Sequence, residues 1–173
     1  LHCPYEHDKA RLIVQEMTDL LSLDLVDKRL VTDQLVLHIG YDIESLTDPK
    51  IRQQYTGEVV LDHYGRALPR HSHGTANLPR MTSSTRTIVD AMVALFDRIV
   101  NPLLLVRRVN VVAARVFPEA EADRRPPYEQ LDLFTDYAAE DARREAEDAA
   151  LRRERNCQRA VLDIRRRFGK NAI

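Results

Sequence analysis

The stretch that decides the fold is residues 83–116, SSTRTIVDAMVALFDRIVNPLLLVRRVNVVAARV. Its first part predicts a helix, because apolar side chains recur at intervals of three and four residues. This stripe consists of Ile88, Met92, Leu95, Phe96 and Ile99. Thr82, Ser83 and Ser84 offer hydroxyls that can cap the helix, and Asn101-Pro102 ends it. The β-branched run at 103–116 then predicts a strand in which Val109, Val111 and Ala113 share one face.

Three more elements are predicted upstream of this stretch. Residues 6–23 form an amphipathic helix on a stripe of Ala10, Ile13, Met17 and Leu20, with Val14 and Leu21 beside it. A strand follows, because Leu35, Leu37, Ile39 and Tyr41 alternate with Gln34, Val36, His38 and Gly40. The polar segment 43–62 is an excursion between strands. Another strand is expected between about 70 and 78, at an edge or broken because of Pro69.

The order of these elements is helix, strand, strand, helix, strand, which indicates an α+β domain over residues 1–117. We expect a sheet covered on one face by two helices, with its other face uncovered. Residues 118–129 are Pro-rich and predict a flexible linker, and 130–135 form a separate motif. Residues 136–173 predict a charged tail helix whose thin stripe, Cys157, Val161, Ile164 and Phe168, could hold a partner, with Gly169 as C-cap.

Composition excludes several classes of protein. None of the apolar runs in these 173 residues approaches the roughly 20 needed to cross a bilayer, and the first residues lack the order of a signal peptide. Cys3 and Cys157 are too few for a disulfide scaffold or a four-cysteine zinc site, so a reduced, cytoplasmic setting is expected. Residue 1 is Leu, which suggests a fragment of a longer chain.

Charge is segregated along the chain although the net charge is only -1. Residues 1–62 carry -6, 63–117 carry +6, 118–149 carry -7 and 150–173 carry +6. A local basic field can attract a polyanion even when the total charge is near zero. The block 63–117 is therefore the candidate for binding nucleic acid.

Candidate DNA-binding side chains lie on and around two predicted strands of this block. Basic side chains with reach contact phosphates and position nucleic acid without reading its sequence. Arg66, Arg70, His71, His73 and Arg80 surround one strand, and Arg107, Arg108 and Arg115 lie on the other. A solvated edge with scattered arginines is the alternative. The uncovered face of the sheet favours DNA.

The segment Gln130-Leu131-Asp132-Leu133-Phe134 predicts a peptide that docks on another protein. Such peptides need large apolar side chains, a polar anchor and a disordered approach. QLDLF resembles the sliding-clamp binding pentapeptide of bacterial replication and repair proteins, and matches it at all five positions. The alternative is that Leu131, Leu133 and Phe134 tether the tail to the domain.

Catalytic and metal-binding patterns are weak. His63, His71 and His73 invite a zinc site, but no Cys or carboxylate lies close enough in sequence to complete a tetrahedral set. Gly-rich phosphate loops, nucleophile elbows and metalloprotease motifs do not occur. We therefore expect no catalytic residue, metal or cofactor in this chain.

Several stretches resemble the C-terminal part of a Y-family translesion DNA polymerase, the UmuC-like type of Gram-positive bacteria. They are VTDQLVLHIGYD at 31–42, DHYGRALPRHSHGTANL at 62–78, SSTRTIVDAMVALFDRIV at 83–100, VRRVNVV at 106–112, QLDLFTDY at 130–137 and LDIRRRFGKNAI at 162–173. Val106, Arg107, Arg108 and Val109 match the pattern that opens the family's last strand.

This resemblance implies a little-finger domain that grips phosphates of the template-primer duplex in its major groove. It implies DNA contacts for Arg70, Thr75 and Asn77 and for Arg107 to Asn110, and recruitment of the polymerase to the sliding clamp in DNA repair and the SOS response. The metal-binding carboxylates and their Mg²⁺ belong to a palm domain outside this sequence. The family's first strand would precede Leu1, and the excursion 43–62 is longer than the hairpin of many relatives.

Two other functions compete with this interpretation. One is a protein-interaction adaptor in which QLDLF and the tail helix are the functional parts. The other is a small metal-dependent enzyme built on the three histidines.

Overall fold

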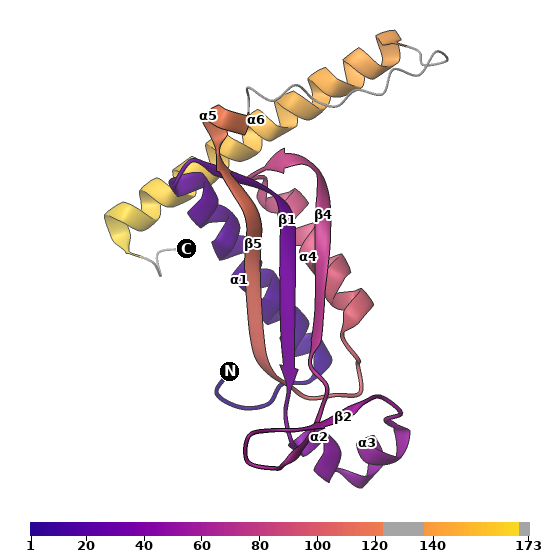
Figure 1. The fold of residues 1–173 in the computed structure, drawn as a ribbon. Helices are drawn as coiled ribbons and strands as arrows, with labels where there is room; N and C mark the ends of the chain where they lie inside the picture. The colour runs from indigo at the N-terminus through magenta and orange to yellow at the C-terminus, as the bar shows by residue number, and fades with distance from the viewer. Residues whose placement is uncertain (123–136, 170–173) are drawn as a thin grey trace.

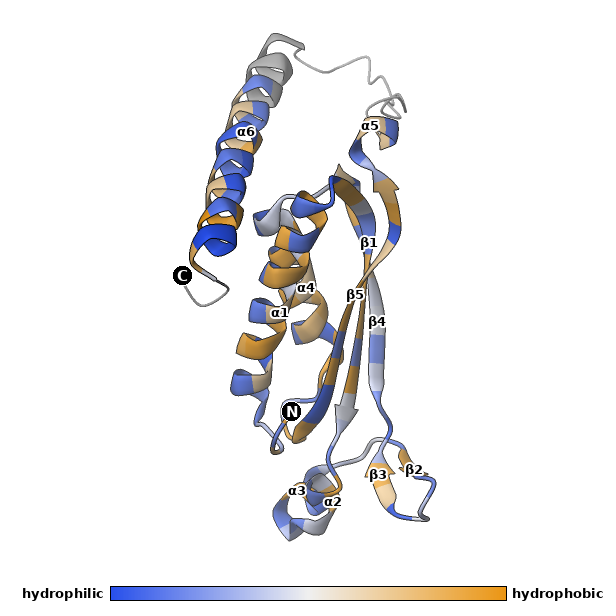
Figure 2. Ribbon diagram, turned by 90° about the vertical axis from the view of Figure 1, so that its left-hand side faces the viewer, coloured by the Kyte–Doolittle hydropathy of each residue, from blue (hydrophilic) through white to orange (hydrophobic). Residues whose placement is uncertain are grey.

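A computed structural model describes residues 1–122 and 137–169. Its centre is an antiparallel sheet in the order β4-β1-β5, formed by Ser72–Thr82, Leu30–Tyr41 and Val106–Pro118. Helices α1, His7–Asp27, and α4, Thr85–Ile99, both pack on one face of the sheet (Figures 1 and 2). Among the described residues, no element covers the opposite face. The predicted α+β fold is confirmed.

The core lies between the sheet and the two helices. Leu35, Leu37 and Ile39 of β1 are fully buried, and their neighbours in the sequence point to the uncovered side. Helix α4 supplies its predicted stripe, of which Ile88, Met92, Leu95 and Phe96 are buried. Full burial of such a side chain contributes about 1.5–3 kcal/mol. Ser84 caps α4 by accepting a hydrogen bond from the Thr87 amide at 3.2 Å, as the sequence predicts.

Helix α1 buries part of the predicted stripe. Ala10 and Val14 are fully buried as expected, but Leu20 is 53% exposed, and Thr18 and Ser22 are buried instead. The Thr18 hydroxyl donates to the Val14 carbonyl at 2.6 Å, and the Ser22 hydroxyl lies 2.7 Å from that of Thr85 on α4. Hydroxyls that are satisfied in this way can be buried at little cost. The contact with α4 therefore follows small polar residues that an apolar pattern does not reveal, and α1 continues past residue 23 to Asp27.

Two strands also differ in their bounds from the prediction. The strand expected at about 70–78 runs from Ser72 to Thr82. The strand expected at 103–116 begins at Val106 and ends at Pro118. Its start is delayed by a turn, in which Asn101 accepts the Leu103 amide on its side-chain oxygen at 3.0 Å. Leu104, in the same turn, is buried in the core.

The excursion after β1 folds into a small lobe, residues 43–71, called here the hairpin lobe. It holds two short helices, α2 at Glu44–Thr47 and α3 at Pro49–Gln54. A two-stranded hairpin follows, with β2 at Val59–Leu61 and β3 at Ala67–Pro69. The lobe is joined to the main domain by Ser45, whose hydroxyl accepts the Leu105 amide at 2.9 Å. It extends beyond the end of the sheet (Figure 1).

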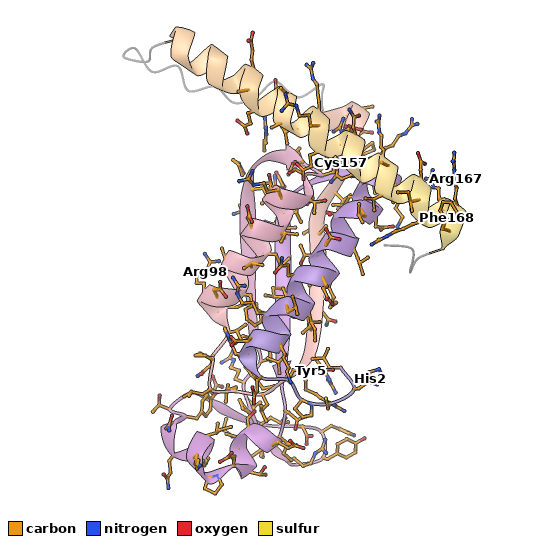
Figure 3. All side chains as sticks on the ribbon, turned by 180° about the vertical axis from the view of Figure 1, so that it is seen from behind. His2, Tyr5, Arg98, Cys157, Arg167 and Phe168 are labelled. Atoms are coloured by element: carbon orange, nitrogen blue, oxygen red, sulfur yellow. The ribbon has the colours of Figure 1, made fainter. Side chains whose placement is uncertain are left out.

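Strand β5 is followed at once by α5, Glu119–Ala122, so the first residues of the expected linker are helical. The tail forms one long helix, α6, at Tyr137–Phe168, and Gly169 caps it with φ +92° and its amide 3.0 Å from the Arg165 carbonyl. The helix crosses the end of the domain opposite the hairpin lobe (Figures 1 and 3).

Helix α6 docks through polar side chains. Gln158 is buried, and its side-chain nitrogen donates to the Ser83 carbonyl at 3.0 Å and to the Thr85 hydroxyl at 2.7 Å. The Glu154 carboxylate accepts the Ser84 hydroxyl at 2.7 Å and the Arg86 amide at 2.9 Å. The predicted apolar stripe is not the docked face. Its Cys157 is exposed and its Phe168 is 74% exposed (Figure 3).

Candidate nucleic-acid interface

The uncovered face of the sheet is built by the alternation of side chains along three strands. Positions next to the buried residues of β1 point away from the helices, and the register aligns them with the same face of β4 and β5. This uncovered face consists of Gln34, Val36, His38 and Gly40 on β1, His73, Thr75 and Asn77 on β4, and Arg108, Asn110, Val112 and Ala114 on β5. No acidic residue occurs among these positions.

Side chains on this face meet across the strands in rows. Gln34 donates from its side-chain nitrogen to the Asn77 side-chain oxygen at 2.9 Å. His38 lies between His73 and Asn110, and its ring stacks on that of His73 with centroids 5.8 Å apart. The His71 ring lies 5.9 Å from the His73 ring and extends this row. The face therefore offers amide, hydroxyl and imidazole groups along its length.

A bulge at the lower end of the sheet changes the direction of two arginines. Gly40 pairs with Arg108 but Tyr41 pairs with Val106, so Arg107 is an extra residue on β5. A Cβ at Gly40 would lie 3.2 Å from the Cβ of Arg108, so glycine lets the arginine pass close to the central strand. Arg107 turns instead toward Asp42, with 3.6 Å between Nε and a carboxylate oxygen.

These arginines border a hollow of about 450 Å³ between the end of the sheet and the hairpin lobe, called here the basic hollow. Arg66, His71, Arg107 and Arg108 line it together with Asp42 and Asp62. Two segments that are far apart in sequence thus contribute cations to one cavity. The two carboxylates offset part of this charge, which leaves a surplus of one guanidinium before the histidine is counted.

Two arginines of the hairpin lobe are held by carboxylates. Arg66 donates through Nε to Asp62 at 2.8 Å, and this hydrogen bond, with two from backbone amides, holds the pKa of Asp62 below its usual range. Arg70 pairs with Glu58, which raises the pKa of the arginine. Both arginine side chains stay more than half exposed, so a phosphate can still approach them.

The predicted DNA-binding residues therefore fall into three places. His73, Thr75, Asn77, Arg108 and Asn110 share the uncovered face. Arg66, His71 and Arg107 line the basic hollow with Arg108. Arg70 lies apart from both groups, in its pair with Glu58.

Two polar residues of the central strand, Gln34 and His38, were missing from the predicted set. Their alternation with Leu35 and Leu37 was the available signal, but only the register shows that they lie beside Asn77 and His73. Two other arginines of the basic block serve internal contacts. Arg115 pairs with Asp33 at 2.8 Å, and Arg80 pairs with Glu147 of α6 at 2.8 Å.

The histidines do not assemble a metal centre in the described part of the chain, where no group of three His, Cys, Asp or Glu side chains could hold an ion. His63 packs against Tyr64, away from the row of His71 and His73. The predicted clamp-binding residues 130–134 lie outside the described residues. Within those residues, no helix is long and apolar enough to span a bilayer.

Comparison with models of known protein families gives a match over most of the chain. The sequence model of the impB/mucB/samB family C-terminal domain matches residues 4–133, which include the whole sheet, both covering helices and the hairpin lobe. No curated protein and no solved structure matches the chain.

Proposed function

Because the chain belongs to the impB/mucB/samB C-terminal domain family, and so contains the little-finger domain of a Y-family DNA polymerase, we propose that its uncovered face grips duplex DNA. The observation that carries this proposal is an uncovered face that has polar side chains on all three strands, has no carboxylate among its eleven positions, and ends in the basic hollow. The chain's contribution is to hold template-primer duplex for a polymerase whose chemistry takes place elsewhere.

The dimensions of the face suit a duplex. The 12 residues of β1 extend over about 40 Å at roughly 3.3 Å per residue, which is about one turn of B-DNA. The outer strands of a three-stranded sheet lie about 10 Å apart, close to the roughly 12 Å width of the major groove. A sheet of this size can therefore follow one groove and reach the phosphates along it.

The groups on the face also predict how it binds. Amide, hydroxyl and imidazole groups can hydrogen-bond to phosphate oxygens, but Arg108 is the one permanent cation among the eleven positions listed for the face. Binding should therefore be weak and independent of sequence, in the range of roughly 10⁻⁴ to 10⁻⁶ M. Such an affinity suits a module that moves along DNA with a polymerase.

The test is a salt titration of duplex binding followed by fluorescence anisotropy. Arg108→Ala should weaken binding equally for unrelated sequences and lower the salt slope by about one unit, the contribution of one phosphate contact. Arg86→Ala is the matched control, because its side chain is 88% exposed on α4, on the covered side of the sheet. Equal effects of the two substitutions, or a loss that depends on sequence, would contradict the proposal.

We also propose that Gln130-Leu131-Asp132-Leu133-Phe134 binds the bacterial sliding clamp. The support is the agreement of this segment with the clamp-binding pentapeptide at all five positions. Two neighbouring apolar side chains suit a pocket, and truncation of such an anchor typically costs 2 kcal/mol or more, about thirtyfold in affinity.

The double substitution Leu133→Ala with Phe134→Ala should abolish clamp binding in calorimetry and leave duplex binding unchanged. The alternative is that these residues tether the tail to the domain. In that case the double substitution would lower the melting temperature by several degrees, and the wild-type chain would not bind the clamp.

A further inference from the structure

The turn between β2 and β3, Asp62-His63-Tyr64-Gly65-Arg66, presents an aromatic ring to solvent. Tyr64 is 78% exposed, which is unusual for a large ring with no partner in the core. The turn that carries it is well held. One oxygen of the Asp62 carboxylate accepts the amides of Tyr64 at 2.8 Å and of Arg66 at 2.9 Å. The Gly65 amide donates to the Asp62 carbonyl at 3.0 Å, with φ +73° that favours glycine.

Tyr64 is flanked by groups that commonly accompany bases in nucleic-acid complexes. The guanidinium carbon of Arg66 lies 5.1 Å from the centre of the Tyr64 ring, within the distance of a cation–π contact. The His63 ring lies 5.3 Å away, edge-on at 70°. Exposed aromatic rings and arginine planes are the surfaces on which unpaired bases stack.

The β2–β3 turn places the Tyr64 ring close to the proposed DNA-binding surface. Arg66 contacts Tyr64 and also lines the basic hollow, which it shares with Arg107 and Arg108 of the main sheet. The β2–β3 hairpin lies on the uncovered side of the sheet, beyond its lower end (Figure 2). A base stacked on Tyr64 would therefore leave its phosphate beside the arginines of the hollow.

The bases of a duplex are already stacked on each other, so they cannot use this ring. We propose that the β2–β3 turn is a stacking site for an unpaired base of single-stranded DNA that continues from the bound duplex. This inference rests on the proposed function, because the sheet must hold the duplex that delivers the strand. The inference adds a second ligand, the single-stranded part of the junction. Gripping of duplex phosphates does not require this ligand.

The experiment compares two DNA probes on the full chain. One is a blunt duplex, and the other is the same duplex with a single-stranded overhang of about six nucleotides, within the range that small single-strand sites cover. We expect the wild type to bind the overhang probe about fivefold or more tightly, the effect of one stacked base. Tyr64→Ala should remove this preference and leave blunt-duplex affinity unchanged.

Two variants separate stacking from other effects. Tyr64→Phe keeps the ring and should keep the preference. Leu61→Ala is the matched control, because Leu61 is 71% exposed on the same hairpin and has no ring. In addition, a photoreactive halogenated uracil in the overhang should crosslink to Tyr64, as located by mass spectrometry of the peptides.

The outcomes distinguish this inference from the proposal on which it rests. If wild type shows no overhang preference, or if Tyr64→Ala keeps it, the stacking site is wrong even when Arg108→Ala weakens blunt-duplex binding. If Arg108→Ala has no more effect on the blunt duplex than Arg86→Ala, the gripping face is wrong and the stacking site falls with it. If Leu61→Ala loses the overhang preference to the same extent as Tyr64→Ala, the preference depends on the shape of the hairpin, and the proposed stacking site is wrong.

Discussion

Replacing Gln158 should release the tail helix from the domain. This buried glutamine donates two hydrogen bonds, to the Ser83 carbonyl and the Thr85 hydroxyl, at the start of α4. A neutral hydrogen bond contributes about 0.5–1.5 kcal/mol net, so Gln158→Ala should cost about 1–3 kcal/mol of docking free energy. The fraction of molecules with α6 detached should then rise about fivefold to more than a hundredfold.

The Arg86 amide reports this detachment directly. It lies in the first turn of α4, where amides have no partner within their own helix, and it donates to Glu154 of α6 at 2.9 Å. Its hydrogen exchange, measured by NMR, should accelerate in Gln158→Ala by the factor given above. Cys157→Ala is the matched control, because Cys157 is the exposed neighbour of Gln158 on the same helix.

An unchanged Arg86 exchange rate in Gln158→Ala would refute the reasoning, as would an equal acceleration in Cys157→Ala. In either case the hydrogen bonds of Gln158 would not be what holds α6 on the domain.

Two further predictions concern stability and its dependence on pH. Gly74→Ala should lower the melting temperature measured by calorimetry, because the new Cβ would lie 2.9 Å from a methyl carbon of Leu95 and 3.2 Å from one of Ile99, and overpacking typically costs about 1–3 kcal/mol. The hydrogen bond from Arg11 lowers the pKa of Asp97 below its ordinary value of 3.8. The pair therefore stabilises the fold at pH values above 3.8, and this contribution is lost as the pH falls through the lower pKa of the folded state. Asp97→Asn should reduce the melting temperature at neutral pH and leave it unchanged in strong acid.

The fold was predictable wherever burial follows a simple period. Helix α4 buries four residues of its predicted stripe, and β1 buries Leu35, Leu37 and Ile39 while their neighbours face outward. The docking of α6 was not predictable in this way. Its apolar stripe indicated a surface that could hold a partner, whereas Gln158 and Glu154 hold the helix on the domain by hydrogen bonds, and such contacts have no periodic signature in a sequence.

The candidate interface was partly predictable for a related reason. Charge composition drew attention to the arginines of residues 63–117, but it could not show which of them pair internally, as Arg115 does with Asp33. It also gave no weight to uncharged residues such as Gln34, whose place on the face depends on the register with β4. Register is set by contacts between distant segments, and so local patterns do not contain it.

The strand order has a consequence for how the domain folds. β1 is the central strand, and its partner β5 lies at the far end of the domain sequence, so that Leu35 pairs with Ala113. Loop closure over such separations is slow compared with the formation of local helices. On the ribosome, α1 and β1 emerge early but cannot complete the sheet until β5 has been synthesised. A chain that stops before Val106 would leave β1 with one open edge, which makes truncation at that point a cause of aggregation rather than a route to a smaller domain.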